Sequence, residues 1–220
     1  MPNWVDNTLT ISGSEEDIAK IKEQLARPKP VKDGEEVEDR VISFWNIKSP
    51  PPEKLNEYWE THGWTGGVAT GQTSDNWYNF NNREWGTKWD ACDANQHTDE
   101  KTTLGYTFNT AWSPPTLFGT LSEQYPDVCI TLRYEEEQGW GGEIEYVNGE
   151  ENEIESWDIP ESHADYAERD NTDGCVCAWN GDDPEDWYDD CPDKGEKIKE
   201  LHKLTLAEVE KIEDISEMLV

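Results

Sequence analysis

The stretch WVDNTLTISGSEEDIAKIKEQLA, residues 4–26, decides the fold. Its first part, residues 4–12, alternates apolar and polar side chains, which predicts a strand with one buried face. Gly13 ends this strand, and Ser14 stands at the N-cap position of a helix with an acidic first turn and an apolar stripe. A strand that leads directly into an amphipathic helix predicts one half of a two-layer α+β domain.

A second strand and helix follow later in the chain. TTLGYTFNTAW, residues 102–112, predicts a strand, and PPTLFGTLSEQYP, residues 114–126, predicts a helix that begins at its prolines. DVCITLRYEEE, residues 127–137, resumes the strand pattern and is expected to pair with residues 141–149, because the glycines between them permit a hairpin turn. Together the two halves predict an α+β fold of the ferredoxin-like type, an antiparallel sheet with both helices on one face.

The region between the two halves is less regular. RVISFWNI, residues 40–47, predicts another strand of the sheet. Residues 49–100 are interpreted as a long aromatic-rich insertion. Within it, residues 55–61 and 77–89 are predicted to be helical, and the glycines between them demand an irregular connection.

The chain is predicted to divide into a ferredoxin-like domain, residues 1–148, and an acidic extension, residues 149–220. The extension ends in an amphipathic helix that Thr205 can cap. Its apolar residues recur at helical spacing; they are Leu206, Val209, Ile212, Ile215, Met218 and Leu219. Such a stripe needs a partner surface, so we expect it to pack back onto the domain or, alternatively, to form a homodimer.

Composition excludes several classes of ligand. The 220 residues carry 50 acidic and 18 basic side chains, a formal charge of −32, together with 12 Trp, 8 Tyr and 4 Phe. Large rings provide the burial that offsets ordering entropy, so the chain is predicted to fold despite its self-repulsion. The same charge repels DNA, RNA and anionic membranes, which leaves basic proteins and metal cations as the expected partners.

The sequence also bears on cellular location and metal binding. No apolar run reaches the length of a membrane span, and MPNWVDNTLT lacks the basic and apolar regions of a signal peptide, so we predict a cytoplasmic protein. The five cysteines are irregularly spaced, which favours reduced thiols. Cys175, Cys177, Cys191 and His163 could supply zinc ligands, but a one-residue spacing is not typical of a zinc knuckle. No metal or other cofactor is therefore predicted.

Four separated motifs carry a family resemblance. They are MPNWVDNTLTISG, WGTKWDACD (residues 85–93), FNTAWSPPTLFGTLSEQYPD and LRYEEEQGWGGEIEY, in that order along the chain. In these motifs the chain resembles the YubB ferredoxin-like family of plasmid- and phage-encoded proteins, over roughly residues 2–147. The resemblance implies a ferredoxin-like fold and a mobile-element origin. It implies no activity and supplies no catalytic residues.

The motif WGTKWDACD is the candidate pocket. In a functional interpretation, Trp85 and Trp89 are the walls of a cleft for a sugar or a base, and Lys88 and Asp90 are its polar groups. In the alternative, the two tryptophans share one helical face and pack in the core. We favour packing, with Lys88 paired to Glu84 or Asp90 at the rim.

Motifs for catalysis are lacking. Carboxylate pairs can be drawn anywhere among 50 acidic residues, so they do not indicate glycoside hydrolysis. The chain contains no nucleophile elbow, phosphate-binding loop or HExxH motif. We therefore predict no catalytic residues, and the alternative is a small hydrolase or a carbohydrate- or nucleotide-binding protein that uses the tryptophan cluster.

The acidic residues are concentrated toward the C-terminus. Residues 135–200 hold 24 acidic and 4 basic side chains, whereas residues 1–134 hold 21 and 12. NGDDPEDWYDDCPD, residues 180–193, interleaves carboxylates with aromatic rings. It lacks the ligand spacing, the turn glycine and the terminal glutamate of an EF-hand calcium loop.

We predict that the acidic region binds a basic host protein that itself binds nucleic acid. Carboxylates can occupy a groove built for phosphates, and aromatic side chains among them supply desolvated anchors. The expected function is inhibition of a host defence protein, DNA mimicry included, and the alternative is that acidity serves only solubility. The expected contact residues are Glu135, Glu136, Glu137, Glu143, Glu145, Asp182, Asp183, Glu185, Asp186, Trp187, Asp189 and Asp190.

Overall fold

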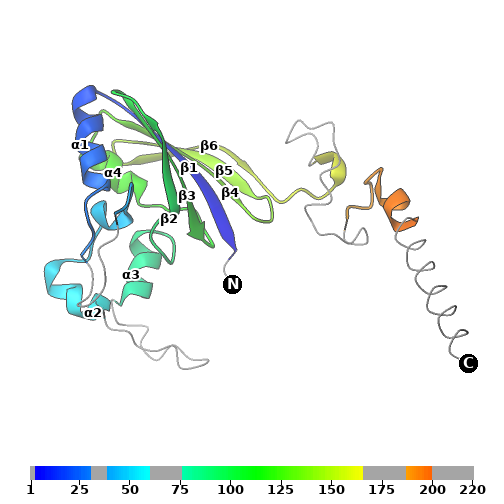
Figure 1. Cartoon of the computed structure of the whole chain (residues 1–220), viewed down its shortest axis with the longest axis horizontal. Helices are drawn as coiled ribbons and strands as arrows, with labels where there is room; N and C mark the ends of the chain where they lie inside the picture. The colour runs from blue at the N-terminus through cyan, green and yellow to red at the C-terminus, as the bar shows by residue number, and fades with distance from the viewer. Residues whose placement is uncertain (1–2, 31–38, 60–75, 166–186, 200–220) are drawn as a thin grey trace, which may run out of the picture. The chain divides into compact units, whose positions relative to one another are not determined.

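The computed structural model describes residues 3–30, 39–59, 76–165 and 187–199 (Figure 1). The chain separates into two compact units, residues 1–158 and 159–220. The first unit contains all the helices and strands that are labelled below.

The first unit alternates short helices with strands. Its described elements are β1 (Trp4–Ser12), α1 (Glu15–Leu25), the 3₁₀ turns η1 (Phe44–Asn46) and η2 (Pro52–Lys54), α2 (Leu55–Trp59), α3 (Trp77–Glu84), β2 (Cys92–Asp99), β3 (Thr103–Ala111), α4 (Phe118–Gln124), β4 (Cys129–Glu136), β5 (Gly141–Val147) and β6 (Glu150–Trp157). The strands predicted over residues 4–12, 102–112, 127–137 and 141–149 are therefore confirmed within one to two residues at their ends.

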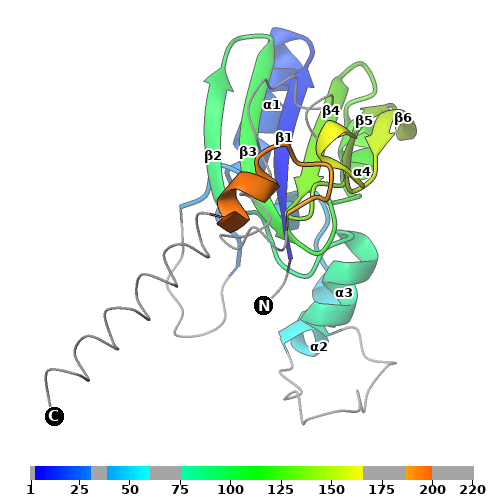
Figure 2. The ribbon, with the colours of Figure 1, turned by 90° about the vertical axis from the view of Figure 1, so that its right-hand side faces the viewer.

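The described strands form one antiparallel sheet of six, in the order β2-β3-β1-β4-β5-β6 (Figure 2). The succession β1-α1-β2-β3-α4-β4 with spatial order β2-β3-β1-β4 is the ferredoxin-like arrangement. The hairpin of β5 and β6 then extends the sheet beyond β4. The predicted α+β, ferredoxin-like fold class is confirmed.

The core lies between the sheet and the two helices α1 and α4, which cover the same face (Figure 1). Alternation along β1 sends Val5, Leu9 and Ile11 into this core at 0% exposure. The two helices meet through Gln24, whose Nε2 donates to Gln124 Oε1 at 2.8 Å. Within the described part of the first unit, no helix covers the opposite face of the sheet, which is lined by the alternate, mostly polar residues of the strands.

The strand predicted over residues 40–47 is wrong. This apolar run instead packs beneath the end of α1 as a 3₁₀ turn, with Phe44 fully buried. Backbone and side-chain bonds explain the change: Ser43 N donates to Leu25 O at 3.1 Å, and Asn46 Nδ2 donates to the same carbonyl at 3.1 Å. The segment therefore closes the C-terminal end of α1, where carbonyls lack helical partners.

Two strands were not expected from the sequence. The second strand of the ferredoxin-like unit is β2, CDANQHTD, which lies inside the predicted insertion. The outer strand β6, EENEIESW, carries the sheet to Trp157, past the boundary expected at residue 148. A turn at Asn148 (φ 50°) and Gly149 (φ 79°) joins β5 to β6, as is typical of a two-residue type I′ hairpin.

The second unit has a small cluster of its own in its described part. Trp187 is 8% exposed and packs with Cys191 and Tyr188. The Tyr188 hydroxyl donates to Pro160 O at 2.7 Å, and Lys194 Nζ donates to Trp187 O at 2.6 Å. The predicted C-terminal amphipathic helix falls on residues 200–220, outside the described residues.

Gly141, at the start of β5, has no space for a side chain, because two neighbouring residues lie close to its Cα. A Cβ there would lie 2.3 Å from the Tyr134 carbonyl oxygen and 2.7 Å from the Trp157 ring. We expect Gly141→Ala to lower the free energy of unfolding by about 1–3 kcal/mol, the usual cost of overpacking, in urea denaturation of the full chain.

The matched control for this change is Gly119→Ala in α4. A Cβ at Gly119 would meet its nearest atoms at 3.8 Å, which is ordinary contact. Since alanine favours helices over glycine by about 0.5–1 kcal/mol, the control should be neutral or stabilising. Equal stability of the two variants would contradict the packing described at Gly141.

Candidate functional site

The segment WGTKWDACD connects α3 to β2, and its first tryptophan is a core residue. Trp85 is 1% exposed and meets Phe44 and Phe80 edge to face, with ring centroids 5.9 and 6.2 Å apart. Its indole Nε1 donates to Lys48 O at 2.8 Å. Trp85 therefore does not form the wall of a cleft.

Lys88 and Trp89 belong to a separate aromatic cluster. Lys88 Nζ lies 4.5 Å from the centroid of Trp89 and 4.9 Å from that of Trp112, so the ammonium makes cation–π contacts with both rings. Trp4 packs against Trp89 at 5.6 Å. Trp112 is 43% exposed and has a φ of 72°, an uncommon conformation for a bulky residue.

The ion pairs expected for Lys88 go to other residues. Glu84 accepts from Arg83 Nε at 2.8 Å and lies 3.9 Å from Lys48 Nζ. Asp90 instead faces Arg40. The prediction of a Lys88 ion pair at the rim is wrong, because the ammonium instead lies over two indole rings and makes cation–π contacts with them.

The buried carboxylate of Asp90 accepts hydrogen bonds from three neighbouring groups. Its Oδ1 accepts from the backbone N–H groups of Phe44 at 2.7 Å and Ala91 at 2.9 Å, and its Oδ2 accepts from Ser43 Oγ at 2.6 Å. The side chain is 7% exposed. A buried carboxylate with three hydrogen bonds is well satisfied, so Asp90 ties the 3₁₀ turn η1 to the start of β2.

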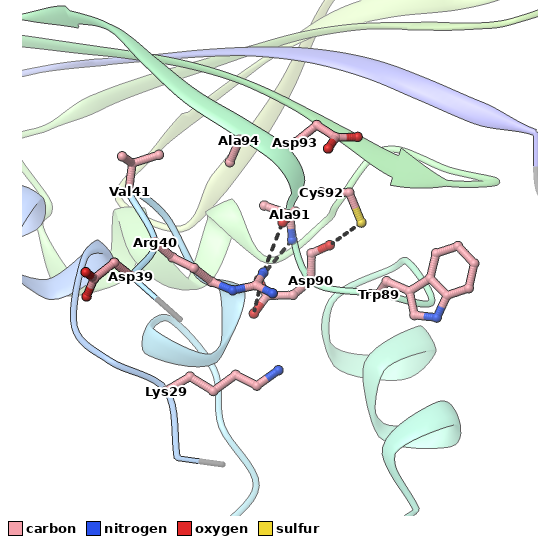
Figure 3. Close-up of a pocket in the computed structure, with 10 residues that line it drawn as sticks. All are labelled: Lys29, Asp39, Arg40, Val41, Trp89, Asp90, Ala91, Cys92, Asp93 and Ala94. Atoms are coloured by element: carbon pink, nitrogen blue, oxygen red, sulfur yellow. Dashed lines mark hydrogen bonds and ion pairs between the residues drawn. The ribbon is translucent and has the colours of Figure 1, made fainter. Parts of the chain in front are cut away.

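A cavity of about 580 Å³ opens beside Asp90 (Figure 3). Its lining combines charged, apolar and aromatic side chains; they are Lys29, Asp39, Arg40, Val41, Trp89, Asp90, Ala91, Cys92, Asp93 and Ala94. Figure 3 shows the Arg40 guanidinium directed at Asp90, with Nη1 at 4.0 Å from Oδ2 and 3.2 Å from the Ala91 carbonyl. Of the four predicted pocket residues, Trp89 and Asp90 line this cavity, whereas Trp85 and Lys88 do not.

The thiol in this cavity is not activated. Burial raises the pKa of Cys92, and the neighbouring carboxylates of Asp93 and Asp90 raise it further, against the opposing effect of Arg40. The pKa shift keeps the thiol protonated at neutral pH, when a nucleophile would need the thiolate. The sequence pattern did not indicate Lys29 or Arg40 as lining residues, because both precede the motif by more than forty positions.

Acidic side chains gather on the face of the sheet that lies opposite α1 and α4. Residues directly opposite each other in an antiparallel pair point to the same face. Asp6 pairs with Glu135 across β1 and β4, and Glu143 pairs with Glu155 across β5 and β6. Glu145 lies two residues from Glu143 on the same side of β5. We call these five residues, Asp6, Glu135, Glu143, Glu145 and Glu155, the acidic sheet face.

One guanidinium sits within the acidic sheet face. Arg133 Nη1 lies 2.8 Å from Glu155 Oε1 and 3.8 Å from Glu143 Oε2, and its Cζ lies 4.6 Å above the Trp157 ring. The Trp157 ring in turn lies beside Gly141, where a Cβ would approach it to 2.7 Å. The face thus already holds one cation between two carboxylates and an indole.

The expected contact residues are distributed unevenly. Glu135, Glu143 and Glu145 lie on the acidic sheet face, and Glu137 is exposed in the turn after β4. The structure corrects the expectation that Glu136 is a contact residue. Glu136 is 3% exposed, points to the helix side, and accepts from Gln138 N at 2.7 Å. It stabilises the turn and is not available to a partner.

The remaining expected contacts belong to the second unit. The structure also corrects the expectation for Trp187, which packs in the small cluster of the second unit and is not an exposed anchor for a partner. Asp189 and Asp190 are exposed, and backbone N–H groups of His163 and Ala164 lower the pKa of Asp190. Asp182, Asp183, Glu185 and Asp186 fall outside the described residues.

Neither a metal cluster nor a membrane-spanning helix is found in the described ranges. No group of three or more His, Cys, Asp or Glu side chains there is arranged to hold a metal ion. Cys175 and Cys177 of the alternative zinc site fall outside those ranges. None of the described helices combines the length and hydropathy needed to cross a bilayer.

Part of the chain is similar to a known family model. Residues 84–178 match a family model described as the ferredoxin-like domain in Api92-like protein. The crystal structure of protein api92 from Yersinia pseudotuberculosis is similar over 73% of this chain and 99% of that chain, with 11% sequence identity and a TM-score of 0.45. No curated protein gives a match. The family model spans β2 to β6 and agrees with the ferredoxin-like fold, while the YubB name is not confirmed.

Proposed function

We propose that the protein is a binding protein whose acidic sheet face engages a basic protein. The observation that carries the proposal is the register of the sheet, which gathers Asp6, Glu135, Glu143, Glu145 and Glu155 on the face opposite α1 and α4. The partner is proposed to be a nucleic-acid-binding protein of a bacterial host, because such proteins present rows of Lys and Arg to phosphates.

The energetics of the face support a cationic partner. Glu143 and Glu155 lie directly opposite each other, and like charges in that position destabilise a sheet. Arg133 compensates in part, since it lies within 4 Å of both carboxylates. Further cations supplied by a partner would relieve the remaining repulsion, and the Trp157 ring beneath Arg133 offers an apolar surface beside the charges.

The biological setting is part of this proposal. The resemblance to the YubB family of plasmid- and phage-encoded proteins suits an inhibitor of a host defence protein, acting in the host cytoplasm by DNA mimicry. A second candidate function is binding of a small polar ligand in the cavity beside Trp89 and Arg40, whose volume of about 580 Å³ is within the range of ligand sites.

The test uses a matched pair of triple variants of the full chain. Glu143→Gln/Glu145→Gln/Glu155→Gln neutralises the acidic sheet face. Glu15→Gln/Glu16→Gln/Glu23→Gln removes the same charge from α1, which covers the opposite face and exposes all three glutamates. Each protein is immobilised, and basic proteins retained from a bacterial lysate are identified at low and high salt and after addition of duplex DNA.

We expect the wild-type chain and the α1 variant to retain the same basic protein, and salt or duplex DNA to release it. The sheet-face variant should bind that protein about tenfold more weakly or worse, since each tenfold loss corresponds to about 1.4 kcal/mol. Equal retention by both variants would show that charge anywhere on the surface suffices and would overturn the assignment to this face.

A further inference from the structure

We infer that the outer edge of β6 is a docking edge for an extended, basic segment of the partner, which adds to the sheet as a further strand. The inference rests on the proposed function and specifies how the partner binds. Within the described residues, β6 pairs with β5 on one side, and its other side is the end of the sheet. An edge strand presents unpaired N–H and C=O groups that another chain can use.

The charge of β6 selects the kind of strand that can pair with it. The strand EENEIESW places Glu150, Glu151, Glu153 and Glu155 along eight residues, of which all but Trp157 are exposed. Lysine or arginine side chains of an added strand would lie opposite these carboxylates on either face, at the cross-strand distance where opposite charges attract. Charged edges normally prevent sheets from pairing with one another, and an edge of one sign stays open to a strand of the other sign.

A second copy of the chain is a poor occupant of this edge. Pairing of β6 with β6 would set glutamate against glutamate, and like charges directly opposite are destabilising. A basic partner strand is favoured instead, because the edge is continuous with the acidic sheet face: Glu155 belongs to both and lies opposite Glu143. A protein held on that face would already bring its basic segments to the edge.

The opposite edge of the sheet is less suitable. The β2 strand pairs with β3 with register shifts at two places, between Cys92 and Asn95 and between Gln96 and Thr98. Such irregularities bend a strand and interrupt its ladder, which blunts an edge against strand addition. β6 shows one register shift against β5, between Glu143 and Ile144, so its ladder is interrupted less often than that of β2.

The experiment compares two synthetic peptides that match β6 in length and differ in their ability to pair. One alternates lysine with threonine. The other replaces every threonine with proline, so it has the same charge but lacks backbone N–H donors at alternate positions. Affinity for the full chain is measured by calorimetry, and backbone amide exchange of residues 150–157 is followed with and without peptide.

Edge docking predicts that the lysine–threonine peptide binds at least about tenfold more tightly than the lysine–proline peptide. It also predicts that amide exchange in β6 slows by about tenfold or more at saturation, while exchange in β2 does not change. Equal affinity of the two peptides would overturn the docking edge and leave the proposed acidic surface intact. Failure of both peptides to bind would count against the docking edge and the proposed function together.

Discussion

Replacing Trp85 with alanine is expected to lower the free energy of unfolding by about 3–5 kcal/mol, the usual cost of removing a buried aromatic side chain. Trp85 is 1% exposed, and its ring touches Phe44 and Phe80, which join η1 and α3 to the core. The change also leaves the Lys48 carbonyl without the indole N–H that it accepts at 2.8 Å. Urea denaturation followed by circular dichroism gives the midpoint and the slope from which this loss is obtained.

Trp112→Ala is the matched control, because it removes the same side chain from the surface. Trp112 is 43% exposed, and its ring makes a cation–π contact with Lys88, while its backbone N–H bond to Asn3 O would survive the change. Cation–π contacts at exposed sites contribute about 0.5–1 kcal/mol, and this indole buries less area than that of Trp85, so the control should lose clearly less than Trp85→Ala. Similar losses for Trp85→Ala and Trp112→Ala would contradict the assignment of Trp85 to the core.

The strands that bury an apolar face could be predicted from the sequence, and the polar edge strands could not. β1 alternates Val5, Leu9 and Ile11 with polar residues, and that pattern depends only on one buried face. β2 and β6 form the two ends of the sheet and bury little, so their sequences carry no apolar period. Hydrogen bonding to an inner strand, which a single-sequence pattern does not report, defines them.

The helix expected to hold both Trp85 and Trp89 ends at Glu84. Gly86 has a φ of 77°, and a Cβ there would lie 2.7 Å from Thr116 Oγ1. This left-handed turn redirects the chain, so the two tryptophans do not share a helical face and enter different clusters. A glycine after a helical run is a stop signal, and it was the feature of the motif that could have separated them.

The acidic sheet face illustrates what strand register adds to a list of charges. The acidic stretch of the sequence predicts Glu135, Glu143 and Glu145 as candidate contact residues, and the structure places all three on this face. Asp6 comes from the first strand and Glu155 from an unexpected one, and cross-strand pairing brings them to the others. Glu136 shows the converse, since its place in the alternation turns it to the buried side.

Asp90→Ala is expected to cost about 3 kcal/mol, because it removes the acceptor of three buried donors at once. The backbone N–H groups of Phe44 and Ala91 and the Ser43 hydroxyl would lose bonds of 2.6–2.9 Å. Arg40 would also lose the carboxylate that lies 4.0 Å from its guanidinium. Thermal and urea unfolding of the full chain measure the loss, with the wild-type chain alongside.

Asp90→Asn separates the hydrogen bonds from the charge. Its carbonyl oxygen can still accept from the N–H groups of Phe44 and Ala91, and its amide can donate to Ser43 Oγ, whose hydroxyl rotates to suit. The asparagine variant should therefore lose about 1 kcal/mol, chiefly through the Arg40 pair. If both variants lost the same amount, the negative charge would be the important property, and Asp90 would act through Arg40 at the cavity and not as the tie between η1 and β2.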